Sequence, residues 1–149
     1  MQKTDINEWV LKVAEKKLWI DGMVSDLRNF GARVEYELGK ERVVSALHYK
    51  IKFFFDDHRA IVTIGIILMD YQTDSDLVIA TMTTLPAHRR RDGFDTDAIG
   101  RIKEWALSNN LRNVRATQVS GFENEKFWMK NGFRKLEGEN PCNDFVCQL

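Results

Sequence analysis

The sequence predicts an α/β (α+β) fold in which helices flank a mixed, mainly antiparallel sheet. Apolar residues first recur with the helical period, then alternate with a period of two, and return to the helical period after a basic loop. Alternating segments joined by short turns pair antiparallel, whereas a strand, a crossover helix and a further strand form a parallel pair. No Gly/Ser-rich linker or internal repeat interrupts the 149 residues, so a single domain over residues 1–149 is expected.

Two helices are predicted at the start of the chain. Residues 5–18 place their apolar side chains on one helical face, and Asp5 is the expected N-cap. A shorter helix is predicted over residues 22–29, and Gly31 is expected to end it. The apolar face of the first helix consists of Ile6, Trp9, Val10, Val13 and Ala14.

Four strands are predicted next, separated by polar turns. The first two alternate between apolar and polar residues, whereas the third is apolar on both faces, as a central strand is. Turns are expected at residues 56–59 and 71–76. The predicted strands are residues 33–38, 47–55, 60–69 and 77–85.

Helical and strand patterns alternate after the basic loop. An apolar stripe predicts a helix over residues 95–107, and two later segments predict strands at 114–119 and 144–149. Between these strands a short helix over residues 123–133 is predicted to stop at an Asn-Gly pair. Trp9, Trp105 and Trp128 fall on helical apolar faces and are expected in the core.

Composition argues against several broad classes of protein. Lys+Arg and Asp+Glu both number 22, which disfavours a general nucleic-acid-binding protein, because its affinity depends on neutralising phosphates. The apolar run at residues 60–69 is too short to span a bilayer, and the N-terminus does not have the pattern of a signal peptide. Cys142 and Cys147 form a C-x4-C pair without a nearby histidine, so reduced thiols, no metal site and a cytoplasmic location are expected.

The basic loop reads RRRDGFDTDAIG over residues 89–100. A helix N-terminus presents unpaired N–H groups and the positive end of the helix dipole, and a preceding glycine lets the backbone approach an anion closely. Such a loop can bind a pyrophosphate, and it can equally be a solvated helix start. The helix N-cap is expected to be Asp95 or Thr96.

Two short motifs follow the fourth strand at a characteristic spacing. RRDGFD at residues 90–95 contains an arginine and a glycine three residues apart, and FWMKNGF follows at residues 127–133. These motifs resemble those of the GCN5-related N-acetyltransferase (GNAT) family, whose acetyl-CoA loop follows the pattern [Q/R]-x-x-G-x-[G/A]. The resemblance of the motifs covers roughly residues 77–138, and the predicted order of elements extends it to most of the chain.

The resemblance implies a GNAT-like domain that transfers an acetyl group from acetyl-CoA to an amine, which attacks the thioester directly. The acceptor is an unidentified small molecule or protein amine, and a homodimer is left open. The resemblance also places a backbone N–H that polarises the thioester carbonyl around residues 83–85. The implied cofactor-binding residues are Thr84, Leu85, Arg90, Arg91, Asp92, Gly93, Phe94, Asp95, Thr96, Asn124 and Phe127.

Two residues depart from the family pattern. Asp95 stands where the loop has a small residue, and Trp128 stands where many members have a tyrosine that protonates the departing thiolate. These departures favour an alternative, in which a GNAT-like fold with weak or no catalysis binds CoA or another protein. Three aromatic residues in a row at 53–55 place at least one ring on the opposite face of the sheet. This ring could belong to a second core layer, an acceptor pocket or a dimer contact.

The general base is not evident from the sequence. The candidates for removing a proton from the acceptor ammonium are Glu35, Glu37 and His88, although alternating acids on a strand usually form a solvated face. His48 is a further candidate for the base, although a surface position on a strand is expected for it. Further titratable groups that could serve are Asp70 and Glu123.

Overall fold

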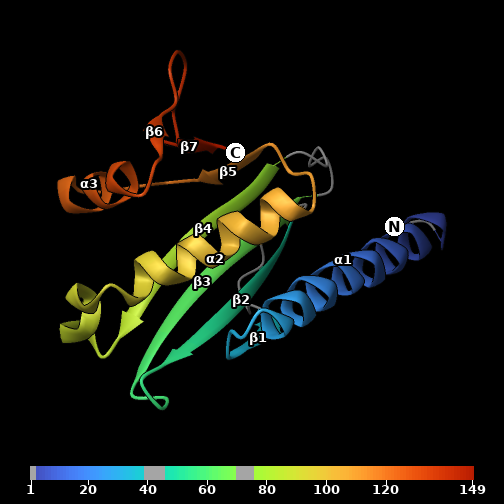
Figure 1. The fold of residues 1–149 in the computed structure, drawn as a ribbon. Coiled ribbons are helices and arrows are strands. Elements are labelled where there is room, and N and C mark those ends of the chain that lie inside the picture. Colours follow the sequence, from blue (N-terminus) through green and yellow to red (C-terminus); the bar gives the residue numbers. More distant parts are fainter. Residues whose placement is uncertain (1–2, 39–45, 70–75) are drawn as a thin grey trace.

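A computed structural model of the chain describes residues 3–38, 46–69 and 76–149 (Figure 1). The four strands of the predicted meander begin and end within one residue of their predicted bounds. Most of the turn predicted at residues 71–76 lies outside the described residues. Within the described ranges, no helix is both long and apolar enough to cross a lipid bilayer. In chain order the elements are α1 (Lys3–Asn29), β1 (Val34–Leu38), β2 (Ala46–Phe55), β3 (Ala60–Met69), β4 (Asp76–Leu85), the 3-10 helix η1 (Ala87–Asp92), α2 (Phe94–Ser108), β5 (Asn113–Ala116), α3 (Phe122–Lys130), β6 (Arg134–Lys135) and β7 (Phe145–Gln148).

Within the described residues, the strands form one seven-stranded sheet in the order β1-β2-β3-β4-β5-β7-β6. β4 and β5 run parallel, and the other neighbouring pairs are antiparallel. The connection from β4 to β5 passes through α2, because a parallel pair needs a crossover. The predicted α/β (α+β) class, with a mixed, mainly antiparallel sheet flanked by helices, is therefore confirmed.

A single helix, α1, occupies the region where the sequence predicts two helices. The helix runs through Gly22, and Asp5 lies inside its first turn rather than at its N-cap, so both of these predictions are wrong. A glycine inside a helix costs about 1 kcal/mol relative to alanine. Ile20 and Met23 on either side of Gly22 are fully buried, and their packing against the core keeps the helix continuous.

Gly31 ends α1, as predicted. It adopts a left-handed φ of 90°, and its N–H donates to the carbonyl oxygen of Arg28 at 3.0 Å. The N–H of Ala32 donates to the carbonyl oxygen of Leu27 at 3.0 Å, which satisfies a second carbonyl of the last turn. The guanidinium of Arg28 then donates to the carbonyl oxygen of Val34 at 2.9 and 3.0 Å, and this joins the end of α1 to β1.

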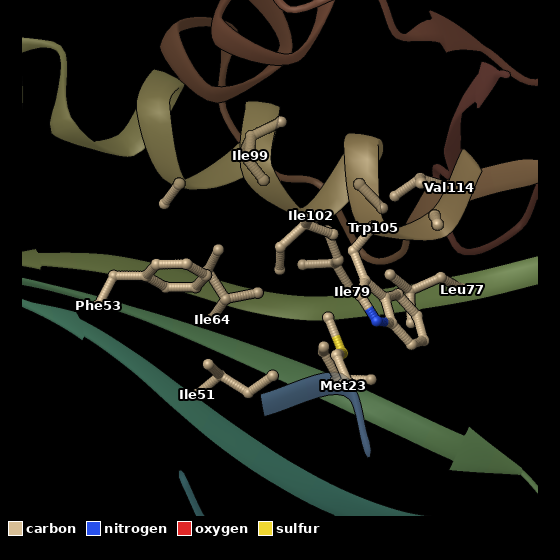
Figure 2. Close-up of a cluster of buried hydrophobic side chains, with 14 of the residues drawn as sticks. Met23, Ile51, Phe53, Ile64, Leu77, Ile79, Ile99, Ile102, Trp105 and Val114 are labelled. Carbon is tan, nitrogen blue, oxygen red and sulfur yellow. The ribbon is translucent and has the colours of Figure 1, made fainter. Parts of the chain in front are cut away.

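The core lies between the sheet and the two helices α1 and α2, which pack on the same face (Figures 1 and 2). Met23 from α1, Ile64 from β3 and Ile102 from α2 point into one cluster and are fully buried. Burying such a side chain stabilises the fold by about 1.5–3 kcal/mol. Trp105 packs edge-on against Trp19 at 5.1 Å between ring centroids, so an aromatic pair joins the two helices.

A β-bulge interrupts the pairing of β4 with β3. Thr81 pairs with Gly65 and Ile79 pairs with Ile66, so Ala80 is the extra residue on β4. A bulge bends its strand and increases the local twist. β4 and β5 lie side by side at their N-terminal ends and diverge beyond this point, as Figure 1 shows.

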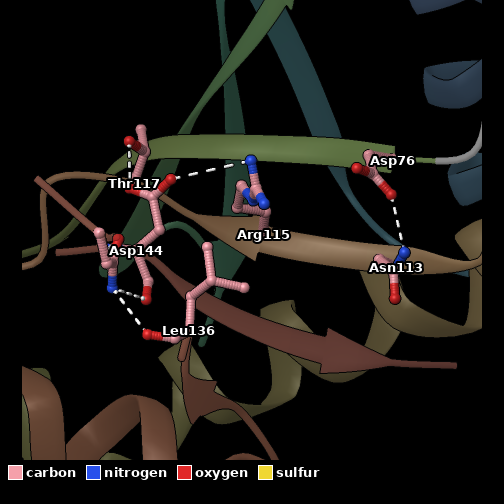
Figure 3. Close-up of polar contacts among 7 residues, drawn as sticks. Asp76, Asn113, Arg115, Thr117, Leu136 and Asp144 are labelled. Atoms are coloured by element: carbon pink, nitrogen blue, oxygen red, sulfur yellow. Dashed lines mark hydrogen bonds and ion pairs between the residues drawn. The ribbon is translucent and has the colours of Figure 1, made fainter. Parts of the chain in front are cut away.

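A network of polar side chains holds β5 against its neighbours (Figure 3). The hydroxyl of Thr117 donates to Oδ1 of Asp144 at 2.7 Å, and Arg115 forms an ion pair with the same carboxylate at 3.8 Å. At the other end of β5, Nδ2 of Asn113 donates to Oδ1 of Asp76 at 2.8 Å. The short strand β5 is therefore fixed by side chains as well as by its backbone ladder.

Candidate functional site

A cleft opens where β4 and β5 separate. The two strands pair through residues 76–79 and 113–116, and the N–H of Thr117 makes the last link to the carbonyl oxygen of Ile79 at 2.9 Å. Beyond this link β4 continues to Leu85, and a cavity of about 270 Å³ lies between the two chain segments. The cavity is lined by residues 79–84, Arg90, Asp95, residues 116–120, Asn124, Phe127 and Trp128.

The β4 wall of the cleft is an open strand edge. β4 pairs with β3 as far as Leu85, whereas its ladder with β5 ends at Ile79. Because successive residues of a strand direct their N–H and C=O groups to alternate edges, alternate residues from Ala80 onward present both groups to the cleft. Residues 80–84 extend over roughly 13 Å at about 3.3 Å per residue. An extended ligand with amide groups can therefore add here as a strand.

The mouth of the cleft lies at the start of α2. Gly93 is the N-cap residue, with a left-handed φ of 85° that glycine adopts without strain. The predicted N-cap at Asp95 or Thr96 is therefore wrong, because the helix already begins at Phe94. A Cβ on Gly93 would meet no atom within 4 Å, so open space lies beside the first N–H groups of the helix. Those N–H groups and the helix dipole favour an anion.

Two arginines of the loop have different surroundings. Arg89 donates through Nε to Asp92 and through Nη2 to Asp56 at 3.0 Å, and these hydrogen bonds raise the pKa of Arg89. Arg90 instead lines the cavity, and the side chain of Arg91 lies outside the described residues. Arg89 therefore joins the loop to the β2–β3 turn, whereas Arg90 is available to a ligand in the cleft.

Asp95 brings a carboxylate into the same mouth. The residue is 8% exposed and lines the cavity. Its Oδ1 accepts a hydrogen bond from the N–H of Thr96 at 3.0 Å, so this amide of the first turn is occupied by a side chain. An anionic group that enters the mouth meets the charges of both Arg90 and Asp95.

α3 closes the cleft on the side of β5. Asn124 and Phe127 line the cavity, and Nδ2 of Asn124 donates to the carbonyl oxygen of Ser120 at 2.6 Å. Trp128 is 7% exposed and packs edge-on against Phe127 and Phe133, with ring centroids 5.3 and 4.8 Å away. Trp128 is thus a core residue, as predicted, and it also lines the cavity between β4 and β5.

Comparison with solved structures identifies this architecture. The PaiA N-acetyltransferase from Thermoplasma acidophilum, in complex with coenzyme A, is similar over 100% of this chain and 80% of its own, with a TM-score of 0.54 and 11% identity. GCN5 from Tetrahymena is similar over 68% of each chain, with a TM-score of 0.50 and 13% identity. No family model and no curated protein matches the sequence. The chain has the fold of the GCN5-related N-acetyltransferases.

The GNAT fold brings only some of the predicted cofactor residues to the cleft. Gly93 stands at its mouth, whereas Asp92 bonds to Arg89 and Thr96 lies outside the cavity lining. Leu85 is 59% exposed outside the cavity, because neighbouring strand residues point to opposite faces. Phe94 stacks against Phe55 instead, at 4.9 Å. The predicted cofactor residues that line the cavity are Thr84, Arg90, Asp95, Asn124 and Phe127.

The predicted candidates for a base lie away from the GNAT cleft. Glu35 and Glu37 belong to β1, at the far edge of the sheet, and Glu37 forms an ion pair with Lys52 at 3.4 Å. His88 is exposed on η1 and does not line the cavity. His48 was expected at the surface, but it is only 4% exposed, because it lies over a glycine of the neighbouring strand.

Sequence reasoning missed the early end of β5, the bulge in β4 and the short strand β6. The strand predicted over residues 114–119 ends at Ala116, and Gln118 then turns the chain with a φ of 55°. A positive φ is uncommon outside glycine, asparagine and aspartate, so the sequence contains no signal for this turn. Ala80 carries no signal for a bulge either, because it continues an apolar run.

Proposed function

We propose that the protein is an acetyl-CoA-dependent N-acetyltransferase, in which an amine attacks the thioester directly. The observation that supports this function is the cleft between β4 and β5, which joins an open strand edge to a helix start that favours anions. CoA has the complementary chemistry, because its pantetheine arm carries amides and its other end carries a diphosphate. The similar PaiA structure contains coenzyme A bound to the protein.

The residues present fit CoA at both ends of the cleft. The pantetheine amides would bond to the backbone of β4 between Ala80 and Thr84, as an added strand does. The diphosphate would meet the first N–H groups of α2 and the guanidinium of Arg90. Asp95 opposes the diphosphate and is expected to lower affinity without closing the site.

With CoA bound in this direction, the acetyl transfer takes place at the end of the cleft that the hydrogen bond from Thr117 to Ile79 closes. Acetyl-CoA supplies the activated acetyl group, and the chain must hold its carbonyl against an attacking amine. With the diphosphate at the mouth, the thioester reaches the bulge at Ala80 rather than residues 83–85, where the sequence places it. A backbone N–H at the bulge would donate to the carbonyl oxygen as negative charge develops there.

Isothermal titration of the full chain with acetyl-CoA tests the binding. We expect one site per chain with an affinity in the range of about 1–100 μM, or roughly −8 to −5.5 kcal/mol. Circular dichroism of the same sample verifies that the protein is folded. A folded protein that shows no heat of binding at millimolar acetyl-CoA would contradict the proposed function.

Release of the CoA thiol in the presence of amines tests the transfer. Spermidine, tyramine and a lysine-containing peptide represent polyamine, arylalkylamine and protein acceptors. Thiol release with at least one of them, above the rate without amine, is the expected result. Binding without release over a broad panel of amines would instead favour the alternative of a CoA-binding module.

A further inference from the structure

Three residues on neighbouring strands meet on the face of the sheet opposite the core. Gly65 on β3 pairs with Thr81 on β4, and on its other side it pairs with Lys50 of β2. His48 lies two residues before Lys50, so it shares the same face and lies diagonally across from Gly65. Tyr49, between them in sequence, points to the opposite face and into the core.

Gly65 provides the space that brings His48 and Thr81 together. A Cβ on Gly65 would lie 2.3 Å from Nε2 of His48 and 2.3 Å from the hydroxyl oxygen of Thr81. Any side chain at this position would therefore displace both groups. Since both atoms lie within that distance of one point, they are separated by no more than twice 2.3 Å. The imidazole thus lies near the hydroxyl on β4, across the middle strand. The two atoms are not hydrogen-bonded to each other in the structure, so a side-chain rotation must join them for a proton to pass.

Thr81 connects this cluster to the cleft. It lines the cavity directly after the bulge residue Ala80, near the closed end marked by the link from Thr117 to Ile79. The thioester is expected at this end, because the diphosphate site lies at the other end of β4. Thr81 is therefore placed beside the reaction, and its hydroxyl lies over Gly65 on the side of His48.

We propose that His48 acts through Thr81 as the proton acceptor for the amine, an inference that rests on the proposed acetyltransferase function. The acceptor ammonium gives one proton to the Thr81 oxygen, while the Thr81 hydroxyl proton passes to Nε2 of His48. The neutral amine forms the new C–N bond at the carbonyl carbon, and the C–S bond breaks as the tetrahedral intermediate collapses. The thiolate takes the second nitrogen proton, and His48 returns its proton to solvent. His48 is thus a positioning residue, and Thr81 is the group that touches the substrate.

The chain offers a matched control for His48. It contains three histidines, and His58 is exposed in the turn between β2 and β3, at the opposite end of β2. His58→Gln makes the same chemical change as His48→Gln, outside the cavity lining. Thr81→Val removes the hydroxyl at nearly constant volume, and the exposure of Thr81 makes this variant tolerable to the fold.

Steady-state kinetics of thiol release with spermidine, tyramine or the lysine peptide, whichever is fastest, test this role. We expect His48→Gln and Thr81→Val each to lower kcat by about 10²-fold or more, with the KM for acetyl-CoA changed less than about threefold. The double variant should be little slower than either single one, because the two residues act in one relay. His58→Gln should keep the wild-type kcat.

Acetyl-CoA affinity separates this inference from the proposed function. If wild type transfers acetyl groups and both variants bind acetyl-CoA with near wild-type kcat, the relay is wrong and the function stands. If both variants lose acetyl-CoA binding, the cluster is structural and the relay is again wrong. A wild type that neither binds nor transfers overturns both ideas together.

Nitrogen NMR of the histidine rings in the ligand-free protein gives a readout independent of turnover. His48→Gln and His58→Gln assign the ring signals of these two histidines by their disappearance. Thr81→Val is expected to shift the His48 ring nitrogens and to leave those of His58 unchanged. An unshifted His48 signal would show that the hydroxyl does not contact the imidazole, and would contradict the relay.

Discussion

The two edges of β4 have opposite roles. On one edge, β4 pairs with β3 from Val78 to Leu85, with a single bulge. On the other edge it pairs with β5 only as far as Ile79, and the remaining backbone groups face a cavity. One edge of β4 is therefore hydrogen-bonded to a neighbouring strand along its length, whereas part of the other edge is free to bond to a ligand. The difference shows that the site is created by where pairing stops rather than by a cluster of reactive side chains.

The side chains around the two edges differ in the same way. The β3 side continues into the core through Ile64 and Ile66, which are fully buried. The open side ends near the start of α2, where the oppositely charged residues Arg90 and Asp95 both line the cavity. Substitutions at this mouth should therefore change ligand affinity far more than the stability of the fold.

The largest effect is expected from Gly93→Glu, which should reduce acetyl-CoA affinity at least about 100-fold. A carboxylate about 4 Å from a phosphate charge costs about 4 kcal/mol at an effective dielectric constant of 20, and it would fill the open space beside the helix N–H groups. Titration calorimetry measures the loss.

Gly138→Glu is the control for the backbone strain of this change. Gly138 also has a positive φ, of 80°, and open space around its Cβ position, but it does not line the cavity. We expect this variant to lose some stability and to keep its acetyl-CoA affinity. Equal losses of affinity in the two variants would mean that the start of α2 is not the anion site.

An intermediate effect is expected from Arg90→Ala, which should weaken acetyl-CoA binding by about 10- to 100-fold. Hydrogen bonds to charged groups contribute about 1.5–3 kcal/mol, and Arg90 lines the cavity. Arg89→Ala should change affinity less than about threefold and lower the free energy of unfolding only slightly, because its partners are carboxylates near the surface. Titration calorimetry and urea denaturation measure the two quantities, and the reverse pattern would mean that Arg89 is the phosphate ligand.

The smallest effect is expected from Asp95→Asn, which should tighten acetyl-CoA binding by about tenfold or less. The change removes a negative charge from the mouth, and tenfold corresponds to about 1.4 kcal/mol. The melting temperature should change little, since Gly93 rather than Asp95 is the helix N-cap.

Asp97→Asn is the matched control for Asp95→Asn. Asp97 lies in the same helical turn but outside the cavity, where it pairs with Arg101 at 2.7 Å. We expect this variant to change acetyl-CoA affinity less than about twofold. Weaker binding by Asp95→Asn alone would indicate that the carboxylate holds the ligand rather than repelling it.

Much of the fold was predictable because local pattern determines it. Alternating apolar residues placed β1 and β2, and apolar runs between polar turns placed β3 and β4, all within one residue of their bounds. Gly31 marked the end of α1. The candidate site was predictable only in part, at Thr84, Arg90, Asp95, Asn124 and Phe127. The rest depended on turns such as that at Gln118. Its φ of 55° is unusual for glutamine, so the residue type does not predict the turn.

The sequence by itself determined the order of β1 to β4, α2, β5, α3 and β7, and the position of the arginine–glycine loop at the end of a strand. These features follow from burial periodicity and from the backbone freedom of glycine, which act among neighbouring residues. Only the tertiary structure decided that Arg90 rather than Arg89 faces the cleft, because Asp56, which holds Arg89, comes from a distant turn. It also decided that His48 is buried over Gly65 beside Thr81, since contacts across a sheet depend on strand register and not on position along the chain.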